Sequence, residues 1–262
     1  MIKAIFFDVD GTLLSFRTHR VPESAVQALQ TLHRRGIRLF VASGRRKADI
    51  DRAGLPDVFD GYVTLNGGYC LLADGTEVFR RFIPRPDIET LIELQDTPEA
   101  FPCVLVDDER LLLNFQDEQV ERLARQLDLP IPGAAAPEKW VQAARSGISQ
   151  MLWFFPEDRQ PLVMARFPGC RIHRWSPLFG DVVPAGVGKD GGIERMAAYL
   201  GIRMEETMAF GDGGNDIPML QAAGTSVAMG DAAPRVKQAA DFVTSSVDKD
   251  GIVLALEHFG LL

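Results

Sequence analysis

Two acidic side chains near the start of the chain have the type and spacing of a metal or phosphate site. Asp8 and Asp10 are separated by one residue and follow a mostly apolar run at 2–7. Such a run is typical of a strand buried on both faces, where an unpaired carboxylate would be costly. We therefore expect both acids just past the carboxyl end of the strand, where open parallel sheets form their ligand crevices. Two neighbouring carboxylates repel each other unless one is protonated or a cation separates them, so the pair predicts a hard metal such as Mg2+, which prefers oxygen ligands.

The segment Asp8-Val9-Asp10-Gly11-Thr12 also has two simpler interpretations. Asp-x-Asp-Gly is common in polar turns. A calcium-binding loop also begins with alternating acids, but it needs a glutamate at its twelfth position, and that position here is His19. Taken alone, the segment is compatible with a plain turn, so its chemistry depends on polar residues elsewhere in the chain.

Three further polar signals stand where a predicted strand ends or a predicted helix begins. Ser43-Gly44-Arg45 and Gly211-Asp212-Gly213-Gly214-Asn215-Asp216 each follow a short apolar run. Lys189 opens a predicted helix just past a glycine-rich stretch. In a parallel sheet the carboxyl ends of the strands lie at one edge, so these residues are expected to converge with Asp8 and Asp10.

The combined set suits a dianionic phosphoryl group that is held together with Mg2+. The cation offsets the carboxylates, while Lys189, the Ser43 hydroxyl and backbone N–H groups hold phosphate oxygens. Taken singly, Lys189 has the simpler interpretation of an ordinary surface lysine, and Ser43 that of a residue that caps a helix. Arg45 is equally compatible with substrate binding and with a surface ion pair, and Asn66 is expected to be a turn residue.

Strand and helix patterns alternate in two separate parts of the chain, 1–82 and 185–262. This alternation predicts an α/β fold with a doubly wound, Rossmann-like parallel sheet. Residues 83–184 instead mix short strands and helices without strict alternation, with a turn expected at Asp108-Glu109, and this predicts an inserted α+β unit. We therefore expect a split core, 1–82 and 185–262, that is interrupted by a cap at 83–184.

The composition limits the class of protein. The chain has 262 residues, 46% of them hydrophobic and 24% charged, and a net charge of −8. The negative charge argues against a general nucleic-acid binder, which needs a basic surface. No apolar run approaches the ~20 residues of a membrane helix, and the first residues lack a signal peptide's basic start and cleavage site. Three scattered cysteines indicate reduced thiols, so we expect a cytoplasmic protein, monomeric or a weak homo-oligomer, without nucleic-acid or membrane partners.

The order of the motifs resembles that of the haloacid dehalogenase (HAD) superfamily of phosphatases: Asp-x-Asp-Gly-Thr, Ser-Gly-Arg, Lys, then Gly-Asp-Gly-Gly-Asn-Asp. The long insertion between the second and third motifs resembles the Cof-type subfamily, which carries a type IIB α/β cap. The resemblance covers nearly the whole chain and implies a phosphatase whose cap determines substrate choice. One departure is Asp190, because small residues such as glycine are common after the lysine of the third motif.

The resemblance also implies a role for each matching residue. Asp8 would be the nucleophile that forms an aspartyl-phosphate, and Asp10 would protonate the leaving alcohol and then activate water. Asp212 would bind Mg2+ together with Asp8 and the backbone carbonyl of Asp10. Asp216 would support that metal sphere. The phosphate and the substrate would be held by the remaining motif residues, Ser43, Gly44, Arg45, Lys189 and Asn215.

We therefore expect Mg2+-dependent hydrolysis of a small phosphate ester, such as a sugar phosphate. A phosphosugar mutase is one alternative, and it would isomerise a sugar phosphate without net phosphate release. A non-enzymatic phospho-aspartate receiver is another, and it would carry a long-lived phosphoryl group on Asp8. Asp10 beside Asp8 argues against a receiver because it would hasten hydrolysis, and so does the inserted cap, since a receiver needs no lid.

Overall fold

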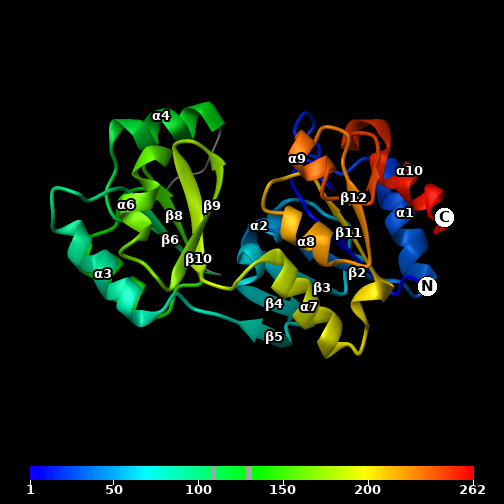
Figure 1. Cartoon of the computed structure of the whole chain (residues 1–262), viewed down its shortest axis with the longest axis horizontal. Coiled ribbons are helices and arrows are strands. Elements are labelled where there is room, and N and C mark those ends of the chain that lie inside the picture. The colour runs from blue at the N-terminus through cyan, green and yellow to red at the C-terminus, as the bar shows by residue number, and fades with distance from the viewer. Residues whose placement is uncertain (108–109, 128–131) are drawn as a thin grey trace. The chain divides into compact units, whose positions relative to one another are not determined.

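The computed structural model describes residues 1–107, 110–127 and 132–262 (Figure 1). The chain divides into two units. The core unit is Met1–Arg80 together with Val187–Leu262, and the inserted unit is Arg81–Gly186. Two distant parts of the sequence therefore fold into one core unit, and the chain between them forms the other.

The core unit is built on an eight-stranded sheet in the order β13-β12-β11-β1-β2-β3-β4-β5. β1 lies between β11 and β2, and six strands run parallel while β4 and β5 form an antiparallel hairpin at one edge. The bounds of the strands are Ala4–Phe7 (β1), Arg38–Ala42 (β2), Gly61–Thr64 (β3), Tyr69–Leu72 (β4), Glu77–Arg80 (β5), Thr207–Gly211 (β11), Thr225–Ala228 (β12) and Phe242–Val243 (β13).

Helices cover both faces of this sheet. α1, α2 and α10 pack on one face, and α7, α8 and α9 pack on the other. The bounds of the helices are Glu23–Arg34 (α1), Lys47–Arg52 (α2), Lys189–Tyr199 (α7), Ile217–Ala222 (α8), Pro234–Lys237 (α9) and Gly251–His258 (α10). Three short 3-10 turns are Leu65–Gly67 (η1), Met204–Glu206 (η3) and Val247–Lys249 (η4).

Alternate residues of the central strand β1 pack on opposite faces of the sheet. Ile5 and Phe7 join the apolar cluster that contains α1 and α10, whereas Ala4 and Phe6 join the cluster that contains α7 and α8. All four side chains are fully buried, which explains why the strand is a continuous apolar run. Burial on both faces, with helices on each, confirms the predicted doubly wound parallel sheet.

The inserted unit has, among its described residues, an antiparallel sheet in the order β7-β6-β8-β10-β9. Its own core is rich in aromatic rings, and Trp153 packs against Phe101 and Phe167 with ring centroids 5.2 and 4.7 Å apart. Helices beside antiparallel strands match the predicted α+β character, while the turn expected at Asp108-Glu109 lies outside the described residues. The bounds are Arg85–Gln95 (α3), Cys103–Val106 (β6), Leu111–Leu113 (β7), Glu118–Leu127 (α4), Pro137–Arg145 (α5), Gln150–Phe154 (β8), Glu157–Arg159 (η2), Gln160–Met164 (α6), Cys170–Ser176 (β9) and Phe179–Pro184 (β10).

The helices of both units are short. Among the described residues the longest is α1, with 12 residues. A helix that crosses a bilayer needs ~20 mostly apolar residues. In the part of the chain that the structure describes, no helix has the length and apolar character for such a crossing.

Candidate active site

Two neighbouring strands bring acids to one edge of the core sheet. β1 and β11 pair in parallel, with Phe7 opposite Phe210, so Asp8 and Asp212 leave their strands at the same end. Asp216 follows in the loop ahead of α8. One carboxylate oxygen from each of these three acids lies within 4.8 Å of the others. The structure thus brings together three of the four acids that the sequence singles out.

Lys189 is the cation that lies among these acids. It is the first residue of α7 and is 1% exposed. Its Nζ lies 2.5 Å from Oδ1 of Asp8 and 2.6 Å from Oδ1 of Asp216. Burial would by itself lower the pKa of the ammonium, but the two carboxylates outweigh burial and raise the pKa of Lys189. Lys189 is therefore charged in the folded protein, and it joins the end of β1 to the loop after β11.

Asp216 has both carboxylate oxygens occupied by hydrogen-bond donors. Oδ1 accepts from Lys189, and Oδ2 accepts from the backbone N–H groups of Asp212 and Gly213 at 3.0 and 2.8 Å. The side chain is fully buried. Asp216 therefore fixes the shape of the loop that presents Asp212, and its oxygens are less available to a metal than those of Asp8 and Asp212.

The loop after β1 supports Asp212 through two small residues. The hydroxyl of Thr12, a fully buried residue, donates to Oδ1 of Asp212 at 3.1 Å. Gly11 has a φ of +82°, and a Cβ at this position would collide with the carboxylate of Asp212. Glycine alone allows both the left-handed backbone and this close approach. Gly11 and Thr12 therefore keep the Asp212 side chain beside the end of β1.

The charged forms of Asp8 and Asp212 are unfavourable in this site, first because of burial and then because of the neighbouring Asp216 carboxylate. Burial raises the pKa of Asp212 to about 7, and the Asp216 carboxylate adds to the shift. Burial likewise raises the pKa of Asp8 well above its usual range, although Lys189 opposes the shift. A cation between the two carboxylates would remove their repulsion, and carboxylate oxygens are the ligands that hard cations prefer. The donor set therefore fits a divalent metal held by Asp8 and Asp212.

We expect the metal-free protein to lose stability as the pH rises from about 4 to about 7. The pKa of Asp212 is about 7 in the folded chain against an ordinary value of 3.8. Between these values the folded state binds the extra proton, so stability falls with rising pH. Asp212→Asn lacks this group, so at about pH 8 in chelator its free energy of unfolding should exceed that of the wild type by at least ~1 kcal/mol. In a chain of this size, 1 kcal/mol corresponds to roughly 2–4 °C, so the melting temperature of the variant should be at least ~3 °C higher.

Thermal melts across this pH range, with chelator or with Mg2+, check the expectation. Mg2+ should stabilise the wild type at the upper end of the range and should have little effect on Asp212→Asn. Melting temperatures that vary in parallel for the two proteins in chelator would show that Asp212 does not carry the raised pKa.

The segment after β2 places Arg45 against Asp10. Nε and Nη2 of Arg45 lie 2.8 and 2.6 Å from Oδ2 and Oδ1 of Asp10. The buried Ser43 hydroxyl accepts the backbone N–H of Arg45 at 3.1 Å. The sequence leaves open whether Arg45 binds substrate or forms an ion pair, and in the structure it forms a two-pronged ion pair with an acid of the first motif. The Asp10 carboxylate therefore faces Arg45 and is not one of the three clustered acids.

Asn66 is expected from the sequence to be a turn residue, but the structure places its side chain in the site. It is fully buried, its Oδ1 accepts from Nδ2 of Asn215 at 3.0 Å, and a Cβ on Gly44 would lie 3.0 Å from its Nδ2. Leu65 and Asn66 have left-handed φ values of 51° and 52° in η1. Asparagine tolerates this conformation but leucine rarely adopts it, so the turn is strained. One feature of the sequence does indicate that Asn66 belongs to the site: it stands just past a buried strand, as the residues of the other motifs do.

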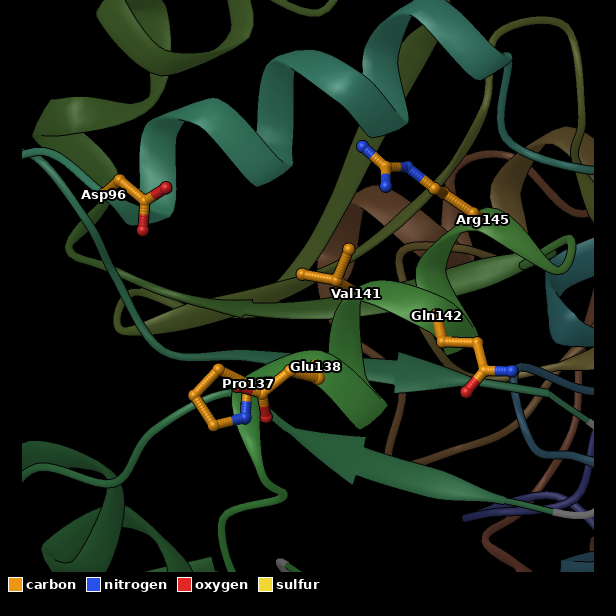
Figure 2. Close-up of a pocket in the computed structure, with 6 residues that line it drawn as sticks. All are labelled: Asp96, Pro137, Glu138, Val141, Gln142 and Arg145. Carbon is orange, nitrogen blue, oxygen red and sulfur yellow. The ribbon is translucent and has the colours of Figure 1, made fainter.

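The inserted unit has a hollow of about 550 Å³ where α5 meets the residue after α3 (Figure 2). Arg145 in this hollow already pairs with Glu89 at 2.7 Å, and two other lining residues are acidic. A phosphate would be repelled there, so the hollow lacks the chemistry that the core unit offers. The lining residues are Asp96, Pro137, Glu138, Val141, Gln142 and Arg145.

Known proteins resemble this chain over its whole length. The family model described as haloacid dehalogenase-like hydrolase matches residues 5–256. A curated relative from Bacillus subtilis (strain 168), named "Putative phosphatase YkrA", is 32% identical over 265 residues, which cover 99% of this chain and 98% of the relative.

Solved structures agree with the sequence matches. BT1666 from Bacteroides thetaiotaomicron, described among phosphatases of the HAD superfamily, has a TM-score of 0.92 at 40% identity, covering 100% of this chain and 96% of that one. The HAD subclass IIB sugar phosphatase BT4131 has a TM-score of 0.86 at 37% identity, covering 99% of this chain and 100% of that one. The full-length match confirms what the order of the motifs predicts: this chain belongs to the haloacid dehalogenase-like hydrolase family.

Proposed function

We propose that this protein is a Mg2+-dependent phosphatase that hydrolyses small phosphate monoesters, sugar phosphates among them, through a phosphoryl group on Asp8. One observation carries the proposal: buried Lys189 bridges Asp8 and Asp216, and Asp212 contributes an oxygen within 4.8 Å of theirs. In this proposal Asp8 is the nucleophile, Lys189 the fixed cation and Asp212 the metal ligand, and their closeness at the carboxyl edge of the core sheet supports these roles. The names of the relatives, the sugar phosphatase BT4131 above all, support the same reaction class.

The first half-reaction transfers the phosphoryl group to Asp8. A carboxylate oxygen of Asp8 attacks phosphorus, the ester P–O bond breaks, and the leaving oxygen takes a proton from the Asp10 carboxyl. Lys189 binds Oδ1 of Asp8, which orients the carboxylate and reduces its repulsion of a phosphate dianion. Mg2+ bound by Asp8 and Asp212 would supply further positive charge beside the phosphate oxygens.

The second half-reaction removes the phosphoryl group from Asp8. Asp10, now ionised, takes a proton from the water that attacks phosphorus, and the bond between phosphorus and Asp8 breaks. The products are an alcohol and inorganic phosphate, and Asp8 returns to its carboxylate form. Because phosphoryl transfer depends mainly on positioning and electrostatics, we assign the phosphate oxygens to Ser43, Asn215 and the backbone N–H groups around Gly44.

We assign substrate choice to the inserted unit, Arg81–Gly186. It has its own sheet and its own apolar core. Its surface can therefore differ between related chains without disturbing the acids of the core unit. In this proposal the core unit performs phosphoryl transfer, and the inserted unit determines which ester is accepted.

Phosphate release from a panel of small phosphate esters, with Mg2+ or with chelator, tests the proposal. We expect release that requires the metal and whose rate differs across the panel. Equal release in chelator would contradict the assignment of Mg2+. Isomerisation of a sugar phosphate without release would identify a phosphosugar mutase, and a stable phosphoryl group on Asp8 without turnover would identify a receiver.

A further inference from the structure

Arg45 forms an ion pair with Asp10, the acid to which the proposed mechanism gives both proton transfers. The ion pair consists of two hydrogen bonds, 2.8 and 2.6 Å long, between two nitrogens of one guanidinium and both oxygens of one carboxylate. The side chains are 37% and 39% exposed, so the pair lies at the edge of the site and not in the apolar core. A two-pronged contact of this kind fixes the plane of a carboxylate as well as its distance.

Asp10 needs a defined orientation because it acts on two partners in turn. It gives a proton to the leaving oxygen and then takes one from water, and each transfer needs hydrogen-bond geometry. Among the described residues, Arg45 is the one side chain that donates to the Asp10 carboxylate. Removal of Arg45 would therefore leave the orientation of that carboxylate undefined.

We propose that Arg45 is a positioning residue that acts through Asp10, and that holding the phosphate is not its main task. The inference rests on the proposed phosphatase chemistry. A protonated carboxyl keeps one oxygen as a hydrogen-bond acceptor. Arg45 can therefore hold that oxygen while the other gives its proton to the leaving group, and it can hold both oxygens when Asp10 is ionised and acts as a base.

The backbone around Arg45 supports this assignment. Its N–H donates to Ser43 Oγ at 3.1 Å, and its carbonyl accepts the N–H of Leu65 at 3.1 Å. Leu65 has the unusual left-handed φ of 51° in η1. The strained turn after β3 thus fixes the position from which Arg45 reaches Asp10.

The test compares leaving groups, because a proton donor matters only when the leaving oxygen needs a proton. For an alkyl phosphate from the panel, Arg45→Met should lower kcat/KM by ~10²-fold, at the lower end of the usual value of general acid catalysis. For p-nitrophenyl phosphate, whose leaving group departs as a stable anion, the loss should be much smaller. Arg45→Lys should show the same preference with a smaller loss, because lysine keeps the charge but not the two-pronged contact.

A second set of variants separates an action through Asp10 from direct contact with substrate. In an Asp10→Asn background, a further Arg45→Met change should cost almost nothing, since the two residues act as a unit. Arg52→Met is the matched control. This exposed arginine of the core unit pairs with Asp49, and its loss should leave kcat/KM for both esters unchanged. Circular dichroism confirms the fold of each variant, and Arg45→Lys serves if Arg45→Met does not fold.

The inference would be overturned if Arg45→Met lowered kcat/KM equally for both esters and if this loss added fully to that of Asp10→Asn. Such a result would show that Arg45 binds the phosphate itself. A gain in kcat/KM on removal of Arg45 would also overturn the inference, because Arg45 would then restrain Asp10. These outcomes differ from failure of the proposed function, in which the wild type would release phosphate from neither ester.

Discussion

Asp8→Asn is expected to lose phosphatase turnover by at least ~10⁴-fold, because the amide cannot replace the carboxylate as nucleophile toward phosphorus. Asparagine has the same size as aspartate, and its Oδ1 can still accept the hydrogen bond from Lys189. The variant should therefore fold as the wild type does. Phosphate release from the most reactive ester of the panel, measured at saturating Mg2+, checks the loss.

The melting temperature of Asp8→Asn and the activity of a second variant, Asp51→Asn, provide the controls. Burial raises the pKa of Asp8 well above its usual range, so removing its charge should leave the melting temperature unchanged or raise it. Asp51→Asn changes an exposed acid of the same unit that pairs with Lys47, and it should keep full activity. Retained turnover in Asp8→Asn would show that another group is the nucleophile.

Lys189→Met is expected to lose both activity and stability. Without the ammonium, the buried carboxylates of Asp8 and Asp216 lose the cation that, among the described residues, pairs with both of them. Removing one partner of a buried ion pair costs about 3–5 kcal/mol. Losing a fixed charge at the reacting carboxylate should lower turnover by ~10²–10³-fold, as for other preorganised donors.

The pH dependence gives this variant a specific signature. Asp8 already has a raised pKa in the presence of Lys189, and without the lysine it must bind protons at still higher pH in the folded state. Stability should then fall further as the pH rises, since the unfolded chain ionises more readily. Urea unfolding in chelator at about pH 5.5 and about pH 8 measures this loss. Lys47→Met is the control: it removes a lysine that is 24% exposed and pairs with the exposed Asp51, and it should change stability little. A wild-type unfolding midpoint for Lys189→Met at both pH values would contradict the buried ion-pair account.

The fold and the place of the site could be predicted because both depend on local patterns. The run before Asp8 is apolar without alternation because β1 is buried on both faces. Polar residues appear where the strands end, and parallel pairing of β1 with β11 brings Asp8 and Asp212 to the same edge. A short stretch of sequence therefore contains enough information to place each of these residues.

The side-chain pairings could not be predicted in the same way. Arg45 and Asp10 are 35 positions apart, and their contact depends on how the chain turns at Leu65. The sequence predicts only a turn residue at Asn66, because asparagine is common in turns whether or not its side chain is used. Its contact with Asn215 spans 149 positions. Such contacts depend on the course of several loops at once, and no local periodicity specifies them.

A covalent phosphoryl group on Asp8 is the central claim of the proposed mechanism. Acid quenching during turnover of an aryl phosphate, followed by peptide mass spectrometry, tests it most directly. We expect a phosphoryl adduct on the peptide that contains Asp8 when Mg2+ is present, a larger amount in Asp10→Asn because its second half-reaction is slow, and none in Asp8→Asn. Phosphate release by the wild type with no adduct at Asp8 in either protein, or with the adduct on another residue, would contradict the mechanism.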